Sequence, residues 1–318
     1  MAEFMRVEGL KVHYPIRSGF FNRVTDYVYA VDGVDLVFEE GKTYGLVGES
    51  GSGKSTIGKA IIGLEKITDG KIFYEGKDIT SEARKRRSDY RRNVQMIFQD
   101  AMSSFNPKKR ITDVLSEPLR NFENMTPEEE KRKMIELLHI VGLSEDALNK
   151  YPHEFSGGQR QRIGVARAVA INPKLIIADE PVSALDLSVQ AQVLNFMRRI
   201  QDEYNTSYLF ISHDLGVVKH MCDELAIMYR GRFTEYGSRT DIYGDPKHIY
   251  TRRLLSAIPQ TDPNSREENK MNRLRVEKEY QTNASKYFTE EGRVYDLKEL
   301  SSTHKVALKD VNGQGGVN

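Results

Sequence analysis

Cysteine is nearly absent from this 318-residue chain, and tryptophan is absent altogether. The single cysteine, Cys222, allows no internal disulfide and no metal site built from several cysteines, which favours a reducing compartment. Apolar runs are also short, and Leu175–Ala178 falls far below the roughly 20 residues that cross a bilayer. These absences exclude a disulfide-stabilised mini-protein and an integral membrane protein.

An excess of charge of either sign is also missing. Lys and Arg number 47 and Asp and Glu number 46, so the net charge is only +1. A protein that depends on electrostatic attraction to nucleic acid would usually be more basic. The first residues, Met1–Met5, contain no apolar signal segment. We therefore expect a soluble, cytoplasmic protein that does not bind nucleic acid.

Strand-length apolar segments alternate with helical patterns, which is typical of an α/β sheet protein. We expect strands over Thr43–Val47, Lys174–Ala178, Ser207–Ile211 and Leu225–Tyr229, and a helix over Ser188–Tyr204. A further helix after residue 53 should bury Ile57, Ala60, Ile61 and Leu64 on one face.

A mostly helical stretch over about residues 100–165 interrupts this alternation, and we interpret it as an inserted helical subdomain. One of its helices has a clear start, because Thr126 can cap it, Pro127 suits its first position and Glu129 completes a capping box. Composition then shifts near Pro259. We expect one domain over residues 1–258 and a partly flexible C-terminal extension over 259–318, with a small hairpin of Val294–Leu297 and Lys305–Leu308 and a flexible tail at 312–316.

A glycine-rich segment follows the first buried strand and matches the pattern G-x-x-x-x-G-K-[S/T]. Glycines allow backbone N–H groups to curl around phosphate oxygens, and the following helix adds its positive end. Lys54 should reach the β- and γ-phosphates of a nucleoside triphosphate, and the Ser55 hydroxyl should bind Mg²⁺. The cradle predicted from the segment consists of Gly48, Ser50, Gly51, Ser52, Gly53, Lys54, Ser55 and Thr56.

The predicted strand at 174–178 ends in two adjacent carboxylates, Asp179 and Glu180. Like charges so placed repel each other, and a bound Mg²⁺ would relieve the repulsion. We expect Asp179 to hold the metal ion, directly or through water, and Glu180 to polarise the attacking water.

The segment Phe155–Arg162, with the sequence F-S-G-G-Q-R-Q-R, resembles the signature motif of ATP-binding cassette (ABC) ATPases. Phe155 stands where that family usually has leucine. The resemblance implies a P-loop ABC ATPase core with a mixed sheet, an inserted helical subdomain and a small C-terminal extension. It also implies that two cassettes enclose two ATP molecules, each signature turn gripping the γ-phosphate on the partner subunit through residues that correspond here to Ser156, Gly157, Gly158 and Gln159.

Three further motifs resemble those of the family and occur in its usual order, within a resemblance that covers about residues 5–258. Gln99 resembles the Q-loop glutamine, which senses Mg²⁺ and links to the membrane subunits. Asp186 resembles the D-loop aspartate that contacts the other cassette. His213 resembles the switch histidine that reaches the γ-phosphate, which assigns it a catalytic role together with Glu180 and Lys54.

Adenine needs an aromatic face to stack on, and the family's aromatic residue lies just after the first strand. Tyr14 is the best placed candidate, with Phe20 and Phe21 as alternatives. The alternative is that Tyr14 is an ordinary strand residue with no contact to the nucleotide.

Within the family, several segments resemble the oligopeptide and dipeptide importers. They are Gln95–Asp100, Tyr151–Phe155, Asp179–Asp186 and Asp245–Arg252. The resemblance implies an ATPase that powers peptide import, bound peripherally to the cytoplasmic face of the cell membrane. Its implied partners are a second, non-identical ATPase, two membrane permeases and, through the complex, an external peptide-binding protein.

Two alternatives remain open from the sequence. The importer group also includes nickel and metal-chelate importers, and ATPase motifs do not contact the cargo. A non-transport cassette protein that acts on nucleic acid or ribosomes would find support only in the basic run Arg84–Arg87, with Arg91 and Arg92, and such runs are usually solvated surface.

Overall fold

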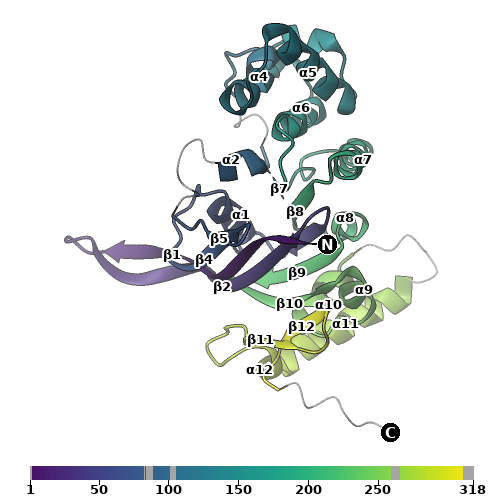
Figure 1. Cartoon of the computed structure of the whole chain (residues 1–318). Helices are drawn as coiled ribbons and strands as arrows, with labels where there is room; N and C mark the ends of the chain where they lie inside the picture. Colours follow the sequence, from purple (N-terminus) through teal and green to yellow (C-terminus); the bar gives the residue numbers. More distant parts are fainter. Residues whose placement is uncertain (1, 82, 84–88, 101–104, 259–265, 311–318) are drawn as a thin grey trace.

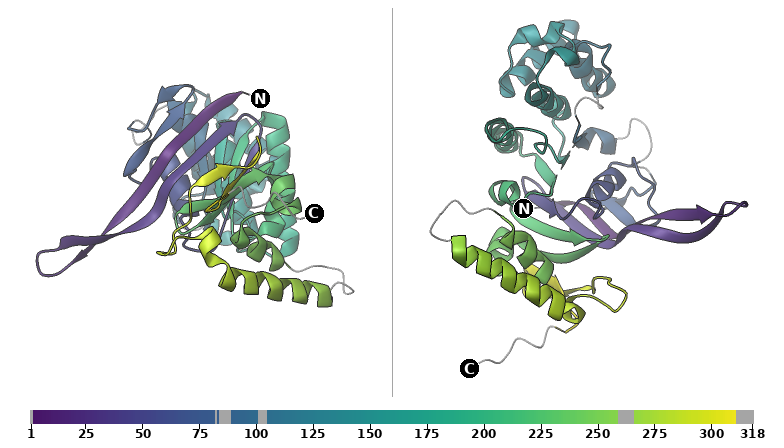
Figure 2. Two further views of the ribbon diagram at one scale, coloured as in Figure 1. Left: turned by 90° about the horizontal axis from the view of Figure 1, so that it is seen from below. Right: turned by 180° about the vertical axis from the view of Figure 1, so that it is seen from behind.

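The computed structural model describes residues 2–81, 83, 89–100, 105–258 and 266–310 (Figure 1). The basic run at 84–87 and the predicted flexible tail at 312–316 lie outside the described residues. The described part contains two β-sheets. The smaller sheet is antiparallel in the order β2-β1-β4-β5, built from β1 (Glu3–Ser18), β2 (Arg23–Glu39), β4 (Asp69–Tyr74) and β5 (Lys77–Asp78). The distal halves of β1 and β2 project from the body as a long ribbon (Figures 1 and 2).

The larger sheet has eight strands in the order β11-β12-β10-β9-β3-β8-β7-β6. Neighbouring strands from β9 to β6 run parallel, and those from β9 to β11 run antiparallel. This is the mixed sheet that the resemblance predicts. Its strands are β3 (Thr43–Val47), β6 (Val94–Ile97), β7 (Leu175–Asp179), β8 (Ser207–Ser212), β9 (Glu224–Tyr229), β10 (Arg232–Ser238), β11 (Leu297–Glu299) and β12 (His304–Ala307).

The helices that connect these strands pack around the larger sheet, and β3, β7 and β8 are buried along their whole length. The helices are α1 (Lys54–Ile61), α2 (Asp89–Asn93), α7 (Leu187–Tyr204), α8 (Leu215–Met221), α9 (Arg239–Gly244) and α10 (Ile249–Ser256). The prediction for α1 is correct for Ile57, Ala60 and Ile61 and wrong for Leu64, which is 52% exposed. The helix ends before Leu64, because Gly63 adopts a positive φ of 77°.

The inserted helices form a separate lobe beyond the edge of the sheet (Figure 1). The start of α5 follows its sequence signal: the Glu129 N–H donates to the Thr126 hydroxyl, and the Thr126 N–H donates to the Glu129 carboxylate at 2.8 Å. The lobe contains α4 (Ile111–Phe122), α5 (Pro127–Ile140), the 3₁₀ turns η1 (Glu145–Asn149) and η2 (Pro152–Glu154), and α6 (Gly157–Val169).

The C-terminal extension folds onto the larger sheet. It contains α11 (Arg266–Thr282), which the sequence analysis does not anticipate, α12 (Ala284–Tyr287), and the hairpin of β11 and β12. The predicted hairpin is therefore present, although Val294 lies outside it and bridges Phe288 instead. Strand β12 pairs with β10, so the extension continues the main sheet. Within the described part of the chain, no helix is long and apolar enough to cross a membrane.

A buried carboxylate joins the extension to the sheet. Glu235 on β10 is fully buried and accepts a hydrogen bond from Nε2 of His304 on β12 at 2.7 Å. That bond raises the pKa of His304; burial opposes the rise, and the nearby charge of Asp241 adds to it. Because folding favours the protonated imidazole, this contact stabilises the chain below the ordinary histidine pKa, near 6.5. The contribution is lost as pH rises through the folded-state pKa.

We therefore predict that His304→Gln destabilises the chain more at low pH than at high pH. The substitution should cost about 2 kcal/mol when the histidine is charged, the scale of a hydrogen bond to an ionised group. Urea unfolding of both forms from about pH 6 to about pH 9 measures the difference across the relevant histidine range. A difference in unfolding free energy that stays constant over this range would contradict the prediction.

Candidate nucleotide-binding site

The glycine-rich segment Gly48–Gly53, which we call the phosphate loop, connects β3 to α1 as predicted. Two of its glycines are required by their surroundings. A Cβ atom at Gly48 would overlap the carbonyl oxygen of Met228, and one at Gly53 would overlap the carbonyl oxygen of Ala30. Gly53 also has a φ of 106°, which side chains rarely allow. The loop is therefore pressed against β2 and β9, with its helix-starting end fixed.

Lys54 is 4% exposed, and its amine bends back over the loop. Nζ donates to the carbonyl oxygens of Gly48 at 2.7 Å and Glu49 at 2.8 Å. Burial lowers the pKa of Lys54, while the nearby charges of Glu180 and Asp179 oppose the shift. A buried amine held in this way places its charge where phosphate groups would enter the loop.

Asp179 ends β7 beside the first turn of α1. The Ser55 hydroxyl donates to Asp179 Oδ1 at 2.7 Å, and burial raises the pKa of the Asp179 carboxyl group. The two side chains come from positions 124 residues apart in sequence, yet they form one cluster of hard oxygen donors, which is the type of ligand that Mg²⁺ prefers. The predicted metal-binding pair thus meets in the fold, and its donor set fits the ion.

Glu180 contacts two other predicted residues, Gln99 and His213. Its Oε2 accepts from Gln99 Nε2 at 2.9 Å, and its Oε1 lies 3.1 Å from His213 Nδ1. Glu180 has a φ of 47°, in the left-handed region that non-glycine residues seldom occupy. Such strain persists where surrounding contacts hold it, and it clusters at functional sites. Here the Glu180 N–H donates to the carbonyl of Ile211 at 2.9 Å, which holds the turn against β8.

A cavity of about 550 Å³ lies beside the phosphate loop and is lined by it. It brings together residues from the loop, from Gln99, from the end of β7 and from His213. Sequence reasoning missed two of its lining residues, Ala30 and Leu254, which belong to no nucleotide motif. The described lining consists of Ala30, Gly48, Glu49, Ser50, Gly51, Gly53, Lys54, Ser55, Thr56, Gln99, Glu180, His213 and Leu254. Ser52 is a buried residue of the loop, and its hydroxyl lies 3.5 Å from the Lys54 amine.

The signature residues occupy a different place. Ser156 begins α6 in a capping box with Gln159: the Gln159 N–H donates to the Ser156 hydroxyl, and the Ser156 N–H donates to the Gln159 side chain at 2.9 Å. Asp186 likewise caps α7 and is exposed. Among the described residues that line the phosphate cavity, none is Ser156, Gly157, Gly158, Gln159 or Asp186. Gly157 instead lines a neighbouring pocket together with Gln99 and Glu180, so the signature turn lies beside the phosphate cavity rather than in it.

The three aromatic candidates for adenine lie at different distances from the loop. Tyr14 is 39% exposed, and its hydroxyl interacts with Glu65 and Thr56; burial is the main reason why its pKa is raised. Phe20 and Phe21 lie near the turn of the ribbon and are 100% and 78% exposed. Strand β1 continues for four residues beyond Tyr14, to Ser18, which is about 13 Å of extended strand before the turn that carries Phe20. Of the three, Tyr14 is the one whose hydroxyl reaches α1, at Thr56, although it is not among the described residues that line the cavity.

Comparison with known proteins agrees with this geometry. A profile of the ABC transporter family matches residues 31–183. The ATP-binding cassette MJ0796, solved as a dimer in a post-hydrolysis state with ADP and Pi, superposes with a TM-score of 0.64 at 26% identity, covering 74% of this chain and 98% of that one. The protein cbiO1 of Clostridium perfringens, part of the ABC transporter complex cbiONQ, has a TM-score of 0.66 at 23% identity, covering 80% and 96%. The chain is therefore an ABC ATPase.

Sequence relatives place the chain more narrowly. The oligopeptide transport ATP-binding protein OppF of Lactococcus lactis is 58% identical over 308 residues, which is 97% of each chain. The OppF protein of Salmonella typhimurium is 46% identical over 276 residues, covering 86% of this chain and 83% of the relative. The chain belongs to the family of ATP-binding proteins of oligopeptide and dipeptide ABC transporters.

The two loop glycines with positive φ allow a matched test of the close packing at Gly53. Gly51 has a φ of 78° and open space at its Cβ, whereas Gly53 faces the Ala30 carbonyl. We predict that Gly51→Ala costs only the backbone strain, about 1–2 kcal/mol, and that Gly53→Ala costs several kcal/mol more because a backbone atom must move. Thermal unfolding of both variants measures this. Equal destabilisation would show that the loop is not pressed against β2 as described.

Proposed function

We propose that this chain hydrolyses ATP to power the import of oligopeptides or dipeptides through a membrane ABC transporter. The observation that carries the proposal is the 58% identity to an oligopeptide transport ATP-binding protein over 97% of both chains. Lys54, Glu180 and His213 line one cavity, and Asp179 is hydrogen-bonded to Ser55 in its wall; this arrangement supports the proposal, because each group has a role in phosphoryl transfer.

In this proposal the phosphate loop binds ATP through its backbone N–H groups, and Lys54 places its positive charge against the β- and γ-phosphates. Ser55, Asp179 and Gln99 would hold Mg²⁺. The ion neutralises phosphate charge as it builds up during transfer. Tyr14 is proposed to stack on adenine beside Thr56, where its hydroxyl already lies.

Glu180 is the group proposed to orient the attacking water and accept its proton. Its carboxylate is held from two sides by Gln99 and His213, so a change at either neighbour would move it. His213 is 54% exposed, and it lines the cavity where it could contact the γ-phosphate. A base needs hydrogen-bond reach to the water, and this pair of contacts fixes its direction before ATP enters.

A second cassette is proposed to complete each ATP site. Ser156, Gly157, Gly158 and Gln159 form an N-terminal helix turn that can bind phosphate, yet they lie outside the cavity of their own chain. Asp186 is exposed beside them and would contact the same partner. We propose that the partner is a non-identical ATPase, so that the two chains contribute loop and signature to each other.

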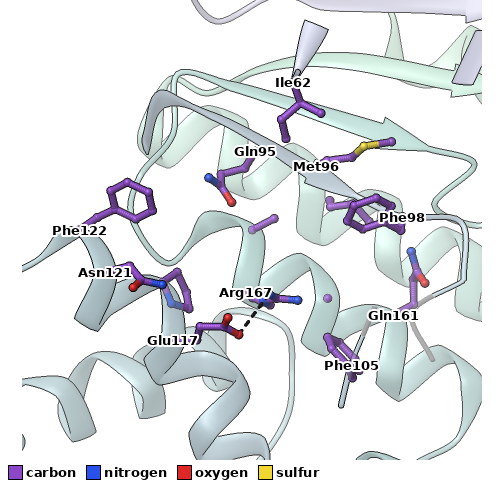
Figure 3. A pocket seen from close by; sticks show the side chains of 14 residues that line it. Ile62, Gln95, Met96, Phe98, Phe105, Glu117, Asn121, Phe122, Gln161 and Arg167 are labelled. Atoms are coloured by element: carbon purple, nitrogen blue, oxygen red, sulfur yellow. Dashed lines mark hydrogen bonds and ion pairs between the residues drawn. The ribbon is translucent and has the colours of Figure 1, made fainter. Parts of the chain in front are cut away.

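A second cavity lies between β6 and the helical lobe, and we propose it as the docking groove for a permease (Figure 3). It has a volume of about 180 Å³, and an ion pair of Arg167 with Glu117 at 3.3 Å lies at one side. Its apolar wall includes Met96, Phe98 and Phe122. Phe98 directly precedes Gln99, so a permease segment bound here would lie one residue from the ATP site.

This arrangement makes the chain a peripheral membrane protein, and we propose that it sits on the cytoplasmic face. An external peptide-binding protein would join the complex through two permeases. The relatives named above are peptide transport proteins, and nothing among them favours a metal-chelate cargo or a nucleic-acid target.

We predict that Glu180→Gln stops hydrolysis and peptide uptake together while ATP binding remains. The amide keeps the shape of the side chain and removes its basicity, so turnover should fall by about two orders of magnitude or more. The measurement is ATPase rate and uptake of a labelled oligopeptide by proteoliposomes that contain the complete transporter. Glu203→Gln, which changes an exposed carboxylate of α7, serves as the control. Normal turnover in Glu180→Gln would move the base elsewhere, and ATP-driven uptake of a nickel chelate but no peptide would overturn the cargo assignment.

A pair of double variants tests action of the signature in trans, provided that both native sites are active. Ser156→Arg combined with Lys54→Ala should damage both ATP sites, because the two residues serve different sites. Ser156→Arg combined with loss of the partner ATPase's own loop lysine should damage one site twice and leave the other intact. We therefore predict a higher residual ATPase rate for the second pair. Equal loss in assembled complexes would argue against the trans arrangement, or would show that the sites cannot cycle independently; ATP labelling of each chain separates these outcomes.

A further inference from the structure

The phosphate loop is held by a residue outside every nucleotide motif. The backbone N–H of Glu49 donates to the hydroxyl of Tyr250 on α10 at 3.1 Å, across 201 positions of sequence. Tyr250 is fully buried. The carbonyl of the same Glu49 accepts from Lys54 Nζ at 2.8 Å. Glu49 is therefore held through its N–H by Tyr250 and through its C=O by the lysine that is proposed to meet the phosphates.

Helix α10 is in turn fixed by hydrogen bonds that lead back to the C-terminal extension. The Tyr250 N–H donates to Nδ1 of His248 at 3.1 Å, which caps the helix. The Glu235 carboxylate accepts from the N–H groups of Lys247 at 2.7 Å and His248 at 3.1 Å, and also from His304 on β12. Glu235, His248 and Tyr250 are all fully buried, so water cannot replace these bonds.

Side-chain packing follows the same route. The Tyr250 ring lies 4.8 Å from that of Tyr229, which lies 5.4 Å from that of Phe288 in the extension. Arg252 on α10 forms an ion pair with Glu279 on α11 at 2.8 Å. One turn further along α10, Leu254 lines the cavity around the phosphate loop. The extension and α10 thus pack together (Figure 1), and α10 reaches the nucleotide site through Tyr250 and Leu254.

We propose that the C-terminal extension supports the phosphate loop, and that the Tyr250 hydroxyl is the positioning group that transmits this support to Glu49 and Lys54. The inference rests on the proposed role of the loop in ATP binding. Without the hydroxyl, the Glu49 N–H loses its partner and the loop can shift. Displacements of about 1 Å are enough to impair groups that act by position.

The test compares Tyr250→Phe with Tyr287→Phe in the full-length chain. The first keeps the buried ring and removes only the hydroxyl next to the loop. The second removes a hydroxyl of the extension that donates to Glu279 at 3.1 Å. We expect Tyr250→Phe to weaken ATP binding by about 3- to 10-fold, the effect of one lost hydrogen bond to a buried group. Tyr287→Phe should bind ATP like the wild type, and both variants should lower the thermal unfolding midpoint by a similar amount.

Amide hydrogen exchange in the absence of nucleotide gives a second readout. Exchange of the segment that contains Glu49 should become faster in Tyr250→Phe and stay unchanged in Tyr287→Phe. Unchanged exchange and ATP affinity in Tyr250→Phe would overturn the inference. Equal effects of the two variants would also overturn it, because they would show a general stabilising role.

Lys54→Ala separates this inference from the proposed function beneath it. If that substitution leaves ATP binding intact, the assignment of the phosphate loop fails. If it abolishes ATP binding while Tyr250→Phe has no effect on affinity or exchange, the loop assignment stands and only the support by the extension fails.

Discussion

The need for a rigid loop that turns backbone N–H groups toward phosphate underlies the arrangement of this ATPase. The loop can do this only if the rest of the fold holds its shape. Gly48 and Gly53 allow the loop to lie directly against the carbonyl oxygens of β9 and β2, where any side chain would collide. The Lys54 amine then donates hydrogen bonds to the carbonyl oxygens of Gly48 and Glu49 in the loop. The parallel strands β3, β7 and β8 end at the same edge, which brings Glu180 and His213 to the cavity and Asp179 to Ser55, one of the residues that line it.

Charge at this edge is balanced by mutual contacts. Burial raises the pKa of Asp179 and lowers the pKa of Lys54, because it disfavours the charged form of each side chain. The hydrogen bond from the Ser55 hydroxyl and the positive charge of the Lys54 amine offset part of the cost of burying the Asp179 carboxylate. The Glu180 carboxylate contacts the side chains of Gln99 and His213 at the cavity wall. A bound cation would offset the negative charge of the neighbouring carboxylates Asp179 and Glu180. The signature turn, by contrast, is capped by the hydrogen bonds between Ser156 and Gln159, and it leaves Ser156 and Gly157 exposed.

Sequence patterns predicted the structural elements that depend only on residues close to one another in the chain. The phosphate loop, the capping box at Thr126 and the carboxylates after β7 each follow from residue types at fixed spacing. The class of protein was predicted from several motifs that occur in the order usual for ABC ATPases. What the sequence did not reveal depends on contacts between distant positions. Helix α11 has a polar pattern with little periodicity, and the pairing of β12 with β10 joins segments about 70 residues apart. Tyr250 carries no nucleotide motif, and only the fold brings it to Glu49.

The most direct measurement of the account is a structure of the assembled transporter with a non-hydrolysable ATP analogue and Mg²⁺. The account predicts phosphates within hydrogen-bond distance of Lys54, the metal ion on Ser55 and Asp179, and a signature serine from the other ATPase on the γ-phosphate. Phosphates bound away from the loop would contradict it. So would a γ-phosphate held by Ser156 of the same chain whose Lys54 binds that nucleotide.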